Sequence, residues 1–174
     1  IITSFFPGMY DLFAFHSKPF YLWQYVSGTF MHGSKGAPLW FLWVHLSMNL
    51  LMIIPFGHIL EAQAGSKNTL IVFLVSMLLS SAAFQVLLYG QDELGCGISA
   101  VGYAFVAGGI MHMRSLWKAY SLRTRTLYLL LIVFALVMLL PTITGWVSTC
   151  LHLTGMISYF IVYFALRRFS NQKH

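Results

Sequence analysis

The chain has 174 residues, of which 59% are hydrophobic and 8% are charged, and its formal net charge is +6. Soluble domains carry about 25% charged residues, so this composition excludes a soluble protein and predicts an all-α, polytopic membrane protein with a single domain. Cys96 and Cys150 are too few for a disulfide framework and lack the spacing of a metal site, and a pairing between them is left open.

Residues 1–37 are predicted to form an interfacial loop segment on the outer side of the membrane. They are rich in aromatic residues, are interrupted by Pro7, Gly8 and Pro19, and contain no uncharged run of the roughly 20 residues that a spanning helix needs. The chain begins at Ile1 rather than Met, and no signal peptide is recognisable. We therefore expect an N-terminal piece before Ile1, which has room for a further transmembrane helix.

Residues 38–168 are predicted to form the transmembrane core, followed by a cytoplasmic tail at 169–174. The uncharged run 126–166 is too long for one helix, and Pro141 and Gly145 divide it into two. The five expected spans are 38–60, 69–89, 95–113, 127–145 and 148–166.

The basic residues set the predicted orientation. Alternation of the spans places eight of the ten Lys and Arg residues on one side: Lys67, Arg114, Lys118, Arg123, Arg125, Arg167, Arg168 and Lys173. The positive-inside rule assigns this side to the cytoplasm, so the positive charge reflects a multi-pass protein in a lipid bilayer and no nucleic-acid partner is expected. Asp92 and Glu93 then face outward, which is the periplasmic or extracellular side if the source is bacterial.

Four polar residues on three spans are expected at one level near the outer surface. Ser99 lies about three residues into the third span and His152 about four into the last, within roughly 10 Å of the surface at about 1.5 Å per residue. His45 and Asn49 share one face of the first span at a similar depth. Polar side chains inside a membrane are energetically expensive, and they mark functional sites.

These residue types fit acyl transfer. Histidine can remove the proton of a serine hydroxyl, so Ser99 and His152 are candidates for a Ser-His dyad. No Asp or Glu lies in the outer half of any span, so a Ser-His-Asp triad is not available. His45, the Asn49 amide and the Ser99 backbone N–H are suitable donors to an oxyanion. Small residues would let the third and last spans approach closely: Gly97, Ala100, Gly102, Gly155 and Ser158.

The motifs resemble those of the rhomboid intramembrane serine proteases, over most of the chain from about Asp11 to Arg168. Trp23 and the stretch from Phe30 to His32 are similar to the first outer loop of that family. The matching motifs are Gly97-Ile98-Ser99 with Tyr103 four residues on, His45-Leu-Ser-Met-Asn49, Gly57-His-Ile-Leu-Glu61-Ala-Gln-Ala-Gly65 and His152-Leu-Thr-Gly155.

The resemblance implies a role for each matching residue. Ser99 would be the nucleophile and His152 its base and later its acid, while His45 and Asn49 would line the oxyanion hole. Tyr103 would pack on the His152 imidazole. Supporting or structural roles would fall to Gly97, Gly155, Glu61 and Gly65.

The resemblance also implies a core of six helices, no metal or cofactor, and substrates that are transmembrane segments of other proteins, cut near the outer surface. The chain departs from the family at Trp23-Gln24, where the family has Trp-Arg; this removes a charge and predicts a looser first loop. Other departures are Ala100 in place of glycine, an insertion at about 33–43, and Leu151 and Tyr159 in place of small residues near His152.

Two other functions are left open. The chain could be a catalytically weak or inactive rhomboid-like binder of transmembrane helices, or a membrane redox protein with haem between His45 and His152. For the protease, the span 127–145 is the expected mobile gate, because it carries no proposed catalytic group and Pro141 weakens its outer end.

Overall fold

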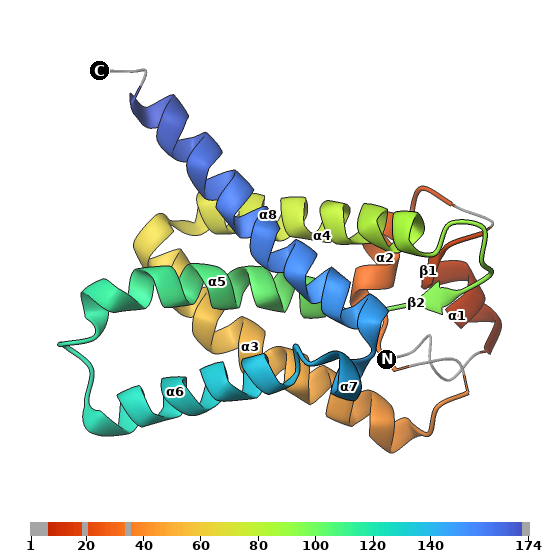
Figure 1. Ribbon diagram of the computed structural model, residues 1–174, viewed down its shortest axis with the longest axis horizontal. Helices are drawn as coiled ribbons and strands as arrows, with labels where there is room; N and C mark the ends of the chain where they lie inside the picture. Colours follow the sequence, from red (N-terminus) through yellow and green to blue (C-terminus); the bar gives the residue numbers. More distant parts are fainter. Residues whose placement is uncertain (1–6, 19–20, 34–35, 172–174) are drawn as a thin grey trace.

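A computed structural model describes residues 7–18, 21–33 and 36–171, and within these ranges the chain is a bundle of helices (Figure 1). The predicted helical membrane fold is confirmed. The elements in chain order are α1 (Pro7–Phe13), β1 (Phe15–His16), α2 (Gln24–Phe30), α3 (Leu39–Ala64), α4 (Ser66–Leu87), β2 (Leu94–Gly95), α5 (Ser99–Leu116), α6 (Leu122–Val137), α7 (Pro141–Thr144) and α8 (Trp146–Asn171).

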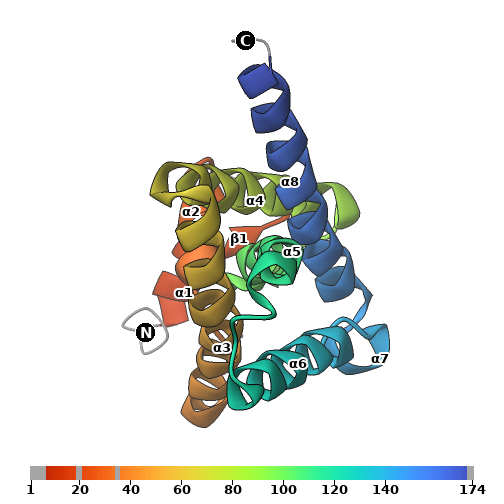
Figure 2. The same ribbon diagram turned by 90° about the vertical axis from the view of Figure 1, so that its left-hand side faces the viewer.

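Helix α5 is the centre of the bundle. Figure 1 and Figure 2 show α3, α4, α6 and α8 arranged around it, and eleven of its 18 residues are buried. Its glycines allow the close approach of large neighbours: a Cβ at Gly109 would come within 2.6 Å of the Phe56 ring, and one at Gly108 within 2.8 Å of the Tyr159 ring. The bundle is therefore built on small residues of α5 that face aromatic residues of α3 and α8.

Three helices of the described chain are long and apolar enough to cross a membrane by length and composition, namely α3, α4 and α8. The other two predicted spans, α5 and α6, are not both long and apolar enough to cross a membrane, and α6 has only 16 residues. For α5 the reason is its position, because a helix covered by protein carries Gly, Ala and polar residues in place of the apolar residues that lipid contact requires.

Several predicted boundaries were wrong. The third span begins at Ser99 rather than at residue 95, because Leu94 and Gly95 form a short antiparallel pair with Phe15 and His16. The expected span 127–145 is divided into α6, which ends at Val137, and the single turn α7.

The corner between α3 and α4 is a single residue. Gly65 has φ +84°, a conformation that glycine adopts without strain, and its N–H bonds to the Glu61 carbonyl. The Ser66 hydroxyl donates to the Glu61 carboxylate at 2.6 Å. Both residues that were expected to be structural thus lie at the turn between the two helices.

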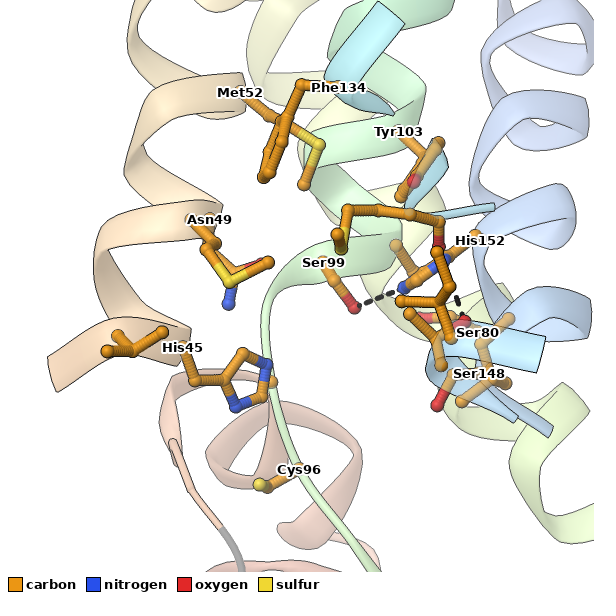
Figure 3. A pocket seen from close by; sticks show the side chains of 18 of the residues that line it. His45, Asn49, Met52, Ser80, Cys96, Ser99, Tyr103, Phe134, Ser148 and His152 are labelled. Atoms are coloured by element: carbon orange, nitrogen blue, oxygen red, sulfur yellow. Dashed lines mark hydrogen bonds between the residues drawn. The ribbon is translucent and has the colours of Figure 1, made fainter. Parts of the chain in front are cut away.

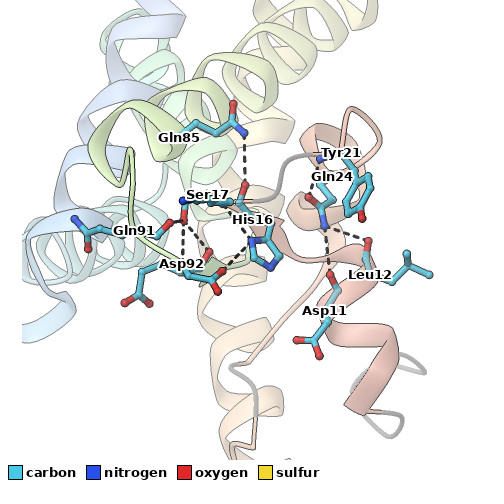
Figure 4. A network of polar contacts seen from close by, with 11 residues as sticks. Asp11, Leu12, His16, Ser17, Tyr21, Gln24, Gln85, Gln91 and Asp92 are labelled. Atoms are coloured by element: carbon cyan, nitrogen blue, oxygen red, sulfur yellow. Dashed lines mark hydrogen bonds and ion pairs between the residues drawn. The ribbon is translucent and has the colours of Figure 1, made fainter.

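In the described part of residues 1–37, two short helices and one strand fold against one end of the bundle (Figure 1). The buried Gln24 amide donates to the Asp11 and Leu12 carbonyls, both at 3.3 Å, and accepts from the Tyr21 N–H (Figure 4). Gln24 therefore anchors this loop through backbone hydrogen bonds, without the charge found in the resembling family. The division into segments 1–37, 38–168 and 169–174 stays a prediction.

Candidate active site

A cavity of about 390 Å³ lies at the end of the bundle that carries α1 and α2. Its walls come from α3, from the segment before α5, from the start of α5, from the α6–α7 region and from α8. All four residues predicted to converge line it: His45, Asn49, Ser99 and His152 (Figure 3).

Ser99 and His152 are hydrogen-bonded, with 3.1 Å between the serine Oγ and the histidine Nε2. Ser99 is the first residue of α5, and His152 lies in the second turn of α8 with 6% of its surface exposed. In the described part of the chain, the one close pairing of a histidine with a carboxylate is His16 with Asp92, away from this pair. The arrangement is a serine and a histidine without an acidic third member.

The close approach of α5 and α8 brings these two side chains together. Gly155 lies one turn after His152, and a Cβ at this position would overlap the backbone carbonyl of Ala100. Gly97 has φ +116°, which lets the chain turn sharply from the β2 segment into α5. Both glycines are therefore required for the geometry of the pair, one for helix packing and the other for the turn that precedes Ser99.

Tyr103 holds the imidazole of His152 from one face. The two rings are stacked, with centroids 4.2 Å apart and an interplanar angle of 19°. The Tyr103 hydroxyl donates to the Ala135 carbonyl of α6 at 2.6 Å. Tyr103 lies one turn after Ser99 on α5, so this helix presents the serine and the ring that orients its partner on the same face.

His45 lies against the segment before Ser99, on the side away from His152 (Figure 3). A Cβ at Gly97 would lie 3.2 Å from His45 Nε2, so the ring packs directly on the glycine. The Gly33 N–H donates to His45 Nδ1 at 3.3 Å. Because Nδ1 accepts this bond, the neutral ring carries its proton on Nε2, the nitrogen on the Gly97 side.

Asn49 lies one turn deeper than His45 on α3 and is 2% exposed. Its Nδ2 has no hydrogen-bond partner among the residues described here, although it lines the cavity beside Ser99 (Figure 3). A buried donor without a partner costs about 1–3 kcal/mol, so such groups call for an explanation.

Two contacts of His45 were not foreseen. His32, part of the stretch similar to the first outer loop, packs edge-on against His45 with ring centroids 5.6 Å apart, and the Gly33 N–H donates to the same ring. Both residues belong to the loop before α3. Because of the insertion at about 33–43, the spacing of the motifs does not predict that this loop returns to contact His45.

Cys96 also lines the cavity and is a free thiol, as is Cys150. The Cys96 thiol donates to the Gly33 carbonyl at 2.6 Å and accepts from the Tyr10 hydroxyl at 3.3 Å. Burial raises the pKa of Cys96 to about 11, so the thiol remains protonated at neutral pH. Cys96 thus acts as a small polar contact between the loop segment and the residues that precede Ser99.

The loop segment is fastened to the approach to α5 at a second place. Ser17 Oγ donates to the Gln91 carbonyl at 2.7 Å and accepts from the Glu93 N–H at 2.9 Å (Figure 4). The Gly97 N–H donates to the Gly28 carbonyl of α2 at 3.0 Å. These bonds fix the path of residues 91–97 and hence the position of Ser99.

No group of three or more His, Cys, Asp or Glu side chains is placed to hold a metal ion in the part of the chain that the structure describes.

The long apolar helices are those of a helical integral membrane protein. The Rhomboid domain model matches residues 19–169, most of the chain, and the protein therefore belongs to the rhomboid family. Members of this family are typically serine proteases that act on transmembrane substrates. Comparison with curated proteins and with solved structures gave no significant match.

Proposed function

We propose that this protein is an intramembrane serine endopeptidase that uses Ser99 and His152 as a catalytic dyad. The observation that carries the proposal is the 3.1 Å hydrogen bond between Ser99 Oγ and His152 Nε2. It lies in a cavity that also holds the Asn49 amide, which has no hydrogen-bond partner among the described residues. Membership of the rhomboid family supports the same reaction class.

In the first step His152 Nε2 accepts the proton of Ser99 while Oγ attacks the scissile carbonyl carbon. The stacked Tyr103 ring holds the imidazole in line with Oγ during this transfer. His152 then donates the proton to the leaving amine, and the substrate acyl group remains on Ser99. A water molecule, deprotonated by the same histidine, releases the acyl group and restores the serine.

The oxyanion of the tetrahedral intermediate needs donors that are in place before the reaction. We propose His45 Nε2–H and Asn49 Nδ2–H₂ for this function, together with the N–H of Ser99 at the positive end of the α5 dipole. The buried and unpartnered Asn49 amide then has a physical reason, because its hydrogen bond forms only when charge develops on the substrate oxygen.

The substrate would be a transmembrane segment that enters sideways between α6 and the rest of the bundle. Helix α6 buries only Tyr128, Leu131 and Ala135, and Phe134 and Met138 of this region line the cavity. We propose that this helix, with α7, gates the site, and that the site opens toward the outer side of the membrane, as the positive-inside rule predicts.

The proposal is tested by cleavage of a model transmembrane substrate by purified protein in lipid vesicles, beside Ser99→Ala and His152→Ala. Each variant is expected to lose at least about 10⁴-fold in kcat, since the two groups act as one unit. Labelling of the two native thiols, Cys96 and Cys150, before and after denaturation, with each site quantified by mass spectrometry, controls for folding. Wild type that binds the substrate helix but does not cut it would contradict the proposal and leave the binder function.

A further inference from the structure

The chain has a second cavity, of about 340 Å³, at the opposite end of the bundle from Ser99. It lies between α3, α4, α5 and α8, where the C-terminal half of α8 leaves the other helices (Figure 1, Figure 2). None of its lining residues belongs to the cavity that contains Ser99. Its chemistry is therefore not explained by the proposed peptide cleavage.

This second cavity combines three polar side chains with a mostly apolar lining. Asn68 and Arg167 lie near helix ends and His112 lies one turn inside α5, while the rest of the lining is apolar or aromatic: Leu60, Ala64, Val72, Tyr159, Val162, Tyr163 and Leu166. Arg167 and Tyr159 are eight residues apart on α8, so the cavity extends about 12 Å along that helix. Three polar groups beside an apolar lining match the headgroup and acyl chain of a lipid.

The positive charge at this end of the bundle favours a negatively charged headgroup. Seven described basic residues lie at this end of the bundle, and of the four acidic residues in the sequence only Glu61 lies there, already bonded to Ser66. Arg167 is exposed, and no described carboxylate forms an ion pair with it. Basic pockets between transmembrane helices on the cytoplasmic side are suited to anionic lipid headgroups.

We propose that this cavity is a binding site for one anionic phospholipid of the membrane leaflet at the basic end, which the positive-inside rule assigns to the cytoplasm. Arg167 pairs with the headgroup phosphate, and one acyl chain fills the space between Val72 and Tyr159. His112 donates a hydrogen bond to the phosphate, as does the second N–H of the Asn68 amide, whose first N–H donates to the Ala64 carbonyl at 2.8 Å. Tyr159 also packs on Gly108 of α5, so the bound lipid supports the helix pair that carries Ser99 and His152.

The test is photo-crosslinking of the full chain in phosphatidylcholine vesicles that contain a trace of lipid with a diazirine on its acyl chain. Phosphatidylglycerol and phosphatidylcholine probes are compared at equal amounts, and the labelled residues are mapped by mass spectrometry. We expect the anionic probe to label the apolar lining of the cavity about fivefold more than the neutral probe, as one basic group near the surface provides.

Two variants separate a built site from a general surface charge. Arg167→Gln is expected to abolish the preference for the anionic probe, whereas Arg168→Gln, its exposed neighbour outside the cavity lining, retains most of it. Ala64→Phe keeps every charge but fills the cavity, and is expected to abolish labelling of the apolar lining by both probes. Equal labelling by the two probes in wild type, or equal losses in both arginine variants, would overturn the proposal.

Discussion

Helix α5 buries eleven of its 18 residues, whereas its neighbour α6 buries three of 16. The first helix carries Ser99 and is enclosed by α3, α4 and α8, while the second presents most of its leucines to the surroundings. Among the described helices, Ser99 thus lies on the most buried one, and one wall of the same cavity is formed by the long helix that buries the smallest share of its residues. Such a division allows one side of the site to move while the serine and histidine keep their geometry.

Outside the proposed dyad, the largest effect, on both stability and cleavage, is expected from the contact between α5 and α8. Gly155→Ala would drive a methyl group into the Ala100 backbone, which cannot move away as a flexible side chain can. We expect a loss of about 3 kcal/mol or more in the free energy of unfolding and at least about a tenfold loss of cleavage rate. Unfolding by denaturant titration in mixed micelles measures the first, and substrate cleavage the second.

Gly102→Ala is the matched control for this change. A Cβ at Gly102 would meet Ile53 at 3.5 Å, which is ordinary contact, and alanine favours a helix interior. We therefore expect unchanged or slightly higher stability. If both variants behave alike, the close packing at Gly155 does not hold the pair together.

A smaller effect is expected from weakening the packing of α6, and here the cleavage rate is expected to rise rather than fall. Leu131 is 8% exposed and packs toward the core, whereas the adjacent Leu130 is 63% exposed. If α6 gates the cavity, Leu131→Ala raises the cleavage rate about two- to fivefold by making opening easier, and Leu130→Ala leaves it unchanged. Rates that are equal in both variants and wild type would contradict the gate.

The smallest effect is expected from loss of the hydrogen bond between Tyr103 of α5 and Ala135 of α6. Tyr103→Phe removes the bond to the Ala135 carbonyl but keeps the ring that stacks on His152. We expect a loss of about 1 kcal/mol in stability and a change in kcat within about twofold. Tyr103→Ala, which also removes the stacking, should lower kcat about tenfold with little change in KM. Equal kcat values for the two variants would show that the stacking does not orient His152.

The pairing of Ser99 with His152 was predictable because each residue sits at a fixed depth from the same end of an apolar run, and small residues accompany both. The placement of His45 and Asn49 followed from their helical spacing. These are local signals, which sequence carries well. The spacing did not predict on which side of the cavity each residue lies.

Contacts between distant segments were not predictable in the same way. Because Phe15 pairs with Gly95, α5 begins at Ser99 rather than at residue 95. His32 and Gly33 contact His45 from a loop whose path depends on distant residues rather than on its own sequence. The end of α6 at Val137 was not predictable either, because the sequence remains apolar from there to Pro141.

The proposed dyad requires that His152 activates Ser99 for attack. The most direct measurement is the reaction of the purified protein in vesicles with a serine-directed fluorophosphonate, with the adduct located by mass spectrometry. We predict one adduct, on Ser99, formed at least about a hundredfold more slowly in His152→Ala. An adduct on another serine, or an equal rate in His152→Ala, would contradict the account.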